Sequence, residues 1–160
     1  MAANARLRDS RYTFRRIASA ANKDFNFGAV SRSVLIADDS ASMRRSVRFL
    51  LERHRIELRI SEAVDGADAI EKARGTKPDL ILLDLAMPRL NGVEAASILQ
   101  GILPNTPIIL FTMHTDLHAD SLSAFIKVDF VSKVDGVSRL LERVDTLLPP
   151  IVSDDGVALH

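Results

Sequence analysis

Polar side chains follow four apolar segments of this sequence, at the point where each segment ends. They are three carboxylates, one hydroxyl and one ammonium: Asp38, Asp39, Asp84, Thr112 and Lys133. Asp84 comes directly after the most apolar run, Leu80 to Leu83. An ionised carboxylate in apolar surroundings is costly unless a cation or hydrogen bonds meet it. The sequence therefore predicts a cationic partner near Asp84.

These residue types together favour phosphoryl chemistry on a divalent cation. Neighbouring carboxylates raise one another's pKa unless a cation lies between them. Mg²⁺ prefers oxygen ligands, takes one or two carboxylates and leaves room for water and phosphate. Lys133 can hold a carboxylate or a phosphoryl oxygen, Thr112 can donate to a second oxygen, and a carboxylate can act as a nucleophile. Each residue alone is also typical of a helix cap, a strand or a solvated surface.

Five apolar segments predict the strands that position these residues. The segments are 33–38, 57–63, 79–84, 107–112 and 128–132. Because they alternate with helical patterns, they predict an α/β fold with a parallel sheet and helices on both faces. In such sheets a ligand site lies outside the carboxyl ends of the strands, where all the polar residues above would meet.

Helices are expected between and after these strands. Met43, Val47, Leu50 and Leu51 mark one helical face after a cap at Ser40, and Ala69, Ile70 and Ala73 mark another after Asp65-Gly66. A third helix begins at Asn91-Gly92 and is expected to end at Gln100, before Gly101 and Pro104. A fourth is predicted over 116–126, and the clearest apolar stripe lies within 137–148, before Pro149-Pro150.

Length and composition predict a single domain with extensions. The chain has 160 residues and zero net charge. It has no cysteine, which excludes a disulfide scaffold and thiolate metal sites. Residues 1–30 carry six basic and two acidic side chains, a net +4, which leaves −4 for the rest. We expect a basic, disordered extension over 1–30, a domain over 31–150 and a tail over 151–160. No apolar run approaches the length of a membrane span.

The motifs resemble the CheY-like receiver domain of bacterial two-component response regulators, over about residues 33 to 148. The matching pieces are "IADDS", "LLDLAMPRLNG", "LFTMH" and "DFVSK". The resemblance implies a doubly wound, flavodoxin-like (βα)5 fold with strand order 2-1-3-4-5. It also implies that Asp84 accepts a phosphoryl group, and that Asp39, Asp84 and the backbone carbonyl of Ala86 bind Mg²⁺. Asp38 would act largely through a bound water.

The resemblance gives roles to the remaining positions as well. Thr112 and Lys133 would hold phosphoryl oxygens, and Phe130 would be the switch aromatic that turns inward on phosphorylation. The residue pattern alone gives Phe130 only as a half-buried strand residue. Val134 stands where many members have proline, which leaves the geometry of the Lys133–Val134 bond open. Met113 stands where small residues are common, and we expect it to cover the mouth of the site.

The resulting expectation is a cytoplasmic signalling switch and not a dedicated enzyme, with weak self-catalysed phosphotransfer and dephosphorylation. Its partners would be a sensor histidine kinase or histidine phosphotransfer protein and a downstream protein, without direct nucleic-acid or membrane contact. A phosphorylation-linked homodimer remains open. An alternative is the receiver fragment of a longer DNA-binding regulator. An aspartyl-phosphate hydrolase of the haloacid dehalogenase type is disfavoured, because Ala86 stands where that class has a second Asp.

A group of arginines follows the first acidic pair. Its members are Arg44, Arg45, Arg48, Arg53, Arg55 and Arg59. We expect a solvated helix face, and the alternative is a docking surface for a kinase.

Overall fold

The computed structural model describes residues 31–55, 57–113 and 127–149, and the expected extension 1–30, helix 116–126 and tail 151–160 lie outside them. Five parallel strands form one sheet in the order β2-β1-β3-β4-β5. The strands are β1 (Arg32–Ala37), β2 (Leu58–Ala63), β3 (Leu80–Leu83), β4 (Ile108–Thr112) and β5 (Asp129–Ser132). The predicted doubly wound, flavodoxin-like fold is therefore confirmed.

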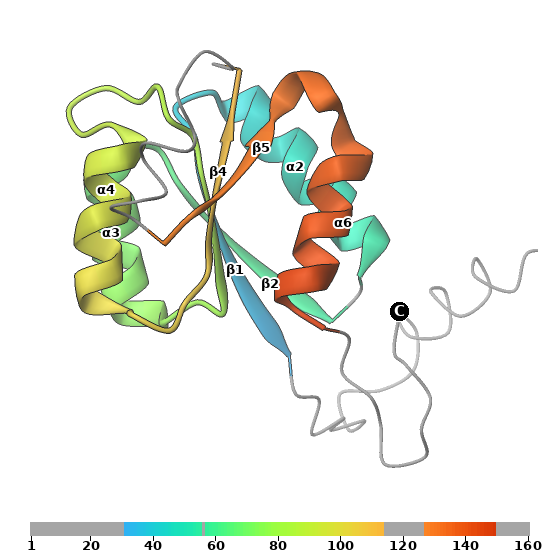
Figure 1. Cartoon of the computed structure of the whole chain (residues 1–160), viewed down its shortest axis with the longest axis horizontal. Coiled ribbons are helices and arrows are strands. Elements are labelled where there is room, and N and C mark those ends of the chain that lie inside the picture. The colour runs from blue at the N-terminus through green and yellow to red at the C-terminus, as the bar shows by residue number, and fades with distance from the viewer. Residues whose placement is uncertain (1–30, 56, 114–126, 150–160) are drawn as a thin grey trace, which may run out of the picture.

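Helices cover both faces of this sheet (Figure 1). The described ones are α2 (Ala41–His54), α3 (Gly66–Thr76), α4 (Gly92–Ile102) and α6 (Val137–Leu147), with a 3-10 turn, η1 (Lys133–Asp135). In Figure 1, α3 and α4 lie on one side of the sheet and α2 and α6 on the other. Among the described helices, none has both the length and the apolar character needed to cross a membrane.

The hydrophobic core consists of one cluster on each face of the sheet. Leu35, Ile81 and Leu83 face the cluster beneath α3 and α4, whereas Ile36 and Leu82 face the one beneath α2 and α6. The central strand β3 is buried on both faces, which explains its unbroken apolar run. The two clusters bury the strands on both faces, and the polar residues follow at the strand ends.

Side-chain caps begin three of the helices at the positions where the sequence predicts their starts, although only the cap at Ser40 was expected. Ser40, Asp65 and Asn91 each accept a hydrogen bond from a backbone N–H of the first turn, and Asn91 forms a capping box with Glu94. Asn91 therefore fixes where α4 begins, just after the loop that follows Asp84.

The expected end of α4 at Gln100 is wrong. The helix continues through Gly101 to Ile102, and Leu103 leaves helical geometry with φ −129° and ψ 70°. Proline disfavours helical backbone in the residue before it, so Pro104 ends the helix. Gly101 faces open space and is tolerated inside the last turn.

Candidate functional site

Three carboxylates meet at the carboxyl edge of the sheet. One oxygen from each of Asp38, Asp39 and Asp84 lies within 4.8 Å of the others. The cause is the pairing of β1 with β3, which places Ala37 opposite Leu83 and so brings the residues after them together. Asp38 and Asp84 are buried, whereas Asp39 is exposed. The cluster is therefore anchored in the sheet on one side and open to solvent on the other.

Lys133 places its ammonium between two of these carboxylates. Its Nζ lies 2.8 Å from Asp38 Oδ2 and 2.9 Å from Asp84 Oδ1. Lys133 follows β5, which is separated from β3 by β4, so the long side chain crosses the end of β4. On the way its Nζ lies 5.6 Å from the centroid of the Phe111 ring. The predicted cationic partner of Asp84 is thus Lys133.

The charges of this pair are balanced against burial. Burial raises the pKa of Asp84 above its usual range, although the hydrogen bond from Lys133 acts to lower it. Burial alone would lower the pKa of Lys133, but its hydrogen bonds to Asp38 and Asp84 together outweigh burial and raise it. The pair therefore favours the ammonium form of Lys133, while burial still disfavours the charged form of Asp84.

The loop between β3 and α4 is held tightly against Asp84. A Cβ atom at Gly92 would lie 2.2 Å from the Asp84 carbonyl oxygen, so only glycine allows α4 to begin there. The Gly92 N–H donates to the Leu85 carbonyl at 2.9 Å. Ala86 lies exposed between them, beside the acidic cluster in the sequence. The close approach of the Asp84 carbonyl is the physical reason for the glycine in "MPRLNG".

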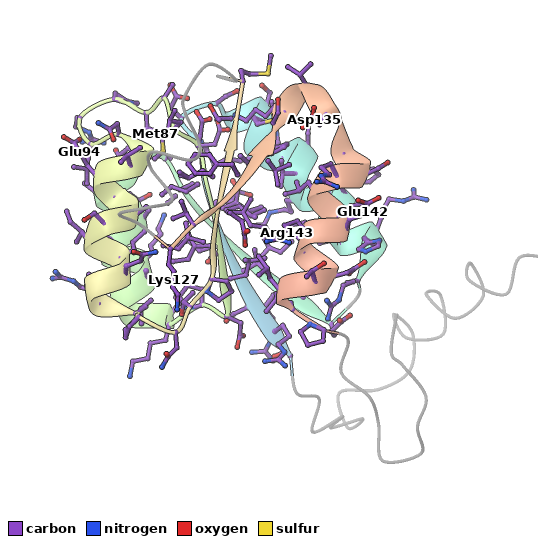
Figure 2. All side chains as sticks on the ribbon, viewed as in Figure 1. Met87, Glu94, Lys127, Asp135, Glu142 and Arg143 are labelled. Carbon is purple, nitrogen blue, oxygen red and sulfur yellow. The ribbon has the colours of Figure 1, made fainter. Side chains whose placement is uncertain are left out.

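The same loop is tied to the start of α3. Arg89 has a positive φ of 68° and forms an ion pair with the buried Asp65, the N-cap of α3. In Figure 2, Met87 of this loop and Asp135 after β5 lie toward one end of the molecule, and Lys127 before β5 lies toward the other. The loops that follow the strands therefore share one edge.

The other predicted residues flank this edge. Thr112 ends β4 and is 3% exposed. Phe130 is partly buried against the cluster under α3 and α4, as its strand pattern indicates. Met113 and Val134 are 60% and 68% exposed. The described residues contain no cis peptide bond, so the Lys133–Val134 bond is trans.

The expectation of a solvated arginine face is wrong for two of its members. Arg55 is 1% exposed, and the Arg44 side chain is 12% exposed. Arg44 donates from Nε to Glu62 at 3.0 Å and from Nη1 to the Asp38 carbonyl at 2.7 Å. Arg48 donates to the second oxygen of Glu62 at 2.6 Å. The four-residue spacing of Arg44 and Arg48 places them on one helix face, but Glu62 is their partner only through the sheet register.

Several proteins are similar to this chain in sequence. The chemotaxis protein CheY of Thermotoga maritima is 31% identical over 118 residues, which cover 72% of this chain and 97% of that protein. The uncharacterized transcriptional regulatory protein YxjL of Bacillus subtilis is 42% identical over 79 residues. These residues are 49% of this chain and only 36% of YxjL. A match to a protein-glutamate methylesterase of Thermotoga maritima likewise spans only 33% of that enzyme.

Solved structures and the family comparison agree. The Vibrio cholerae chemotaxis protein CheY4 superposes with a TM-score of 0.67 at 25% identity, covering 74% of this chain and 100% of that one. The receiver domain of AraT from Geobacillus stearothermophilus gives 0.66 at 28% identity, covering 74% and 93% of the two chains. Residues 34–145 match the response regulator receiver domain. The chain therefore belongs to the response regulator receiver domain family of two-component signalling systems.

Proposed function

We propose that Asp84 accepts a phosphoryl group from a phosphohistidine on a sensor histidine kinase or a histidine phosphotransfer protein. The altered receiver then signals to a downstream protein. The observation that carries this proposal is the cluster of three carboxylates with the Lys133 ammonium placed between Asp38 and Asp84. Such a cluster provides a nucleophile, a cation site and a group that can follow a phosphoryl oxygen, all at one sheet edge.

The donor set fits Mg²⁺. The cluster offers only hard oxygen ligands, and its open side leaves room for water and phosphate. We assign Asp39, Asp84 and the Ala86 carbonyl as direct ligands, and Asp38 as a ligand through water. When bound, Mg²⁺ would neutralise charge on the carboxylates and on the transferring phosphoryl group. It would also supply the positive charge that the buried Asp84 lacks.

In the transfer step, a carboxylate oxygen of Asp84 forms a bond to phosphorus as the bond from phosphorus to the donor imidazole nitrogen breaks. The imidazole keeps the electron pair and takes a proton from solvent. Lys133 leaves Asp84 and holds one phosphoryl oxygen, and Thr112 donates to another. Phe130 then turns toward the space that Thr112 vacates, which changes the surface beside β5.

The test is labelling of the full chain with acetyl phosphate and with a phosphorylated histidine kinase, with and without EDTA. We expect one adduct, on Asp84, that requires Mg²⁺ and is absent in Asp84→Asn. Asp79→Asn is the matched control, because Asp79 precedes β3 at the opposite edge and binds Ser33. Label that persists in Asp84→Asn, or that EDTA does not change, excludes the assignment.

A second candidate is that this chain is the receiver part of a longer transcriptional regulator. The likeness to YxjL, which extends well beyond the matched residues, favours it. Sequencing the gene beyond the His160 codon tests this candidate. A downstream helix-turn-helix in the same reading frame would support it, and a stop codon would exclude it.

A further inference from the structure

The backbone of Asp38 is held on both sides by groups outside the acidic cluster. The Asp38 N–H donates to the Ala63 carbonyl at the end of β2, at 3.2 Å. The Asp38 carbonyl accepts from Arg44 Nη1 at 2.7 Å. Because a peptide unit is planar, fixing the Asp38 carbonyl also fixes the amide of Asp39. Arg44 thus acts on the backbone that orients both acidic residues.

Arg44 is itself held by Glu62 on β2. Both Glu62 oxygens are occupied, one by Arg44 Nε at 3.0 Å and the other by Arg48 Nε at 2.6 Å. The hydrogen bond from Arg48 lowers the pKa of Glu62 below its usual range. Burial acts in the opposite direction, and the hydrogen bond from Arg44 lowers the pKa further. Lys72 also donates to the Glu62 carbonyl at 2.6 Å. Glu62 is therefore a fixed, ionised anchor for the Arg44 fork.

Asp39 is the member of the cluster with the least support of its own. Its side chain is exposed, and within the described ranges it makes no hydrogen bond or ion pair. Asp38, in contrast, is held by Lys133 and by the Ser40 N–H. The orientation of the Asp39 carboxylate before a cation binds thus depends on its backbone, which Arg44 fixes.

We propose that Arg44, anchored by Glu62, is a positioning residue that pre-organises the Asp38–Asp39 peptide for a divalent cation. This inference rests on the proposed function, because it takes the cluster as a Mg²⁺ site. Groups that orient metal ligands typically change metal affinity by 10- to 100-fold when removed, on the order of 1–3 kcal/mol. We expect the lower end, about tenfold weaker Mg²⁺ binding without Arg44.

A purely electrostatic role predicts the opposite sign. Arg44 carries a positive charge next to the cluster, so removing that charge alone should strengthen Mg²⁺ binding. Lysine keeps the charge but lacks the planar fork that reaches Glu62 and the Asp38 carbonyl together. Arg44→Lys and Arg44→Gln therefore separate the two explanations.

The experiment is a Mg²⁺ titration of the full chain, followed by calorimetry and by the NMR shifts of the Asp39 and Asp84 amides. Arg44→Lys, Arg44→Gln and Glu62→Gln should each weaken Mg²⁺ binding by about tenfold. They should also broaden or shift the Asp39 amide before metal is added. Arg48→Gln is the matched control, because Arg48 shares Glu62 but does not contact Asp38. It should change the dissociation constant by less than about twofold.

Each outcome decides the inference. Arg44→Lys with wild-type affinity, or Arg44→Gln with tighter binding, leaves only the electrostatic role and overturns the proposal. Equal weakening by Arg48→Gln shows a general loss of α2 stability, which thermal melting of all variants would reveal, and also overturns it. A wild-type chain that binds no Mg²⁺ refutes the metal site and the proposed function with it.

Discussion

Two cations are buried at opposite edges of the sheet, and both are paired with carboxylates. At the carboxyl edge, Lys133 lies between Asp38 and Asp84, and its side chain is 8% exposed. At the amino edge, Arg55 pairs with Glu57 at 2.5 Å, and these side chains are 1% and 6% exposed. Both clusters remove charge from water, but only Lys133 is shared between two buried carboxylates, since Asp145, the second carboxylate beside Arg55, is 41% exposed.

The Arg55 cluster joins the ends of two helices. Arg55 is the C-cap of α2 and donates to the carbonyl of Leu148, the C-cap of α6. Asp145 of α6 lies 3.7 Å from the Arg55 guanidinium and 2.8 Å from His54. A guanidinium has several donors in a fixed plane, so it can hold several acceptors at once. The cluster therefore suits a permanent connection between helices.

The cation type separates the two clusters by role. Lysine presents a compact point charge on a flexible stem, so Lys133 can move from one oxygen to another. Its two acceptors are side chains, whereas Arg55 also binds a backbone carbonyl that cannot be replaced. The difference indicates that buried ion pairs of similar exposure can serve exchange at one edge and fixation at the other.

The largest expected effect is on the Arg55 cluster. Arg55→Ala should lower the free energy of unfolding by about 3 kcal/mol, because it leaves Glu57 buried without its cation. Urea unfolding measures this loss, and adding Mg²⁺ should not reduce it. The double variant Arg55→Met with Glu57→Met is the control and should recover much of the loss, since it removes both charges. A loss below about 1 kcal/mol in Arg55→Ala would contradict a structural role.

The cluster of Lys133, Asp38 and Asp84 should respond differently to Mg²⁺. Lys133→Ala leaves Asp38 and Asp84 close together without a cation, so it should destabilise the chain in EDTA by about 1–3 kcal/mol. Saturating Mg²⁺ should bring the loss below about 1 kcal/mol, because a divalent cation can replace the ammonium there. The measurement is urea unfolding of wild type and variant in both conditions. An equal loss with and without Mg²⁺ would place Lys133 in the same class as Arg55.

Lys133→Ala also tests the movement of the lysine toward phosphate. We expect the variant to be labelled on Asp84 but to transmit the change poorly to Phe130. NMR shifts near Phe130, with and without beryllofluoride, measure that coupling. A wild-type shift pattern in the variant would show that Lys133 does not couple the phosphoryl site to Phe130.

The sequence predicted the fold and the residues of the cluster because both depend on short patterns. Apolar runs in alternation specify a parallel sheet, and residues that end neighbouring strands must meet at one edge. The position of Lys133 against Asp84 follows from the same rule. The ends of elements were less certain, as Gly101 shows, because a glycine can end a helix or be tolerated in its last turn.

The sequence did not predict the supporting contacts. Glu62 and Arg44 are 18 residues apart, and their hydrogen bond depends on the register that places Ile36 opposite Glu62. Arg55 looks like part of a charged helix face until the end of α6 covers it. Such long-range partners leave no periodic signal. The roles of the site residues, the cytoplasmic location and the domain limits stay predictions.

A smaller effect is expected at the mouth of the carboxyl edge. Met113 follows Thr112 and is 60% exposed. A long, flexible side chain there can obstruct the in-line approach of water to a phosphoryl group. Met113→Ala should shorten the phosphoryl lifetime by up to about tenfold, or about 1.4 kcal/mol in the barrier. The measurement is the loss of label over time at saturating Mg²⁺, with Val134→Ala as a comparison. An unchanged or longer phosphoryl lifetime in Met113→Ala would refute the idea that Met113 covers the mouth of the site.

The smallest effect concerns the contribution of Glu62, near the carboxyl end of β2, to stability in acid. The hydrogen bond from Arg48 is the largest cause that lowers the folded-state pKa of Glu62. Burial acts to raise this pKa, and the hydrogen bond from Arg44 also lowers it. A lowered pKa means that the folded state binds fewer protons than the unfolded state. The contribution is therefore fully present above the unfolded pKa of about 4.3, and it is lost as pH falls through the folded pKa. Because Glu62 is partly exposed, the contribution should be below about 1 kcal/mol.

Urea unfolding from pH 7 to pH 3 tests this sign. The stability difference between wild type and Glu62→Gln should be largest near neutral pH and should shrink below about pH 4. Glu52→Gln is the control, because Glu52 pairs with the same Arg48 at 3.3 Å but is 44% exposed. Its difference from wild type should be smaller than that of Glu62→Gln. A difference for Glu62→Gln that grows as pH falls would mean that Glu62 is held in its protonated form, which would remove it as the ionised anchor of Arg44.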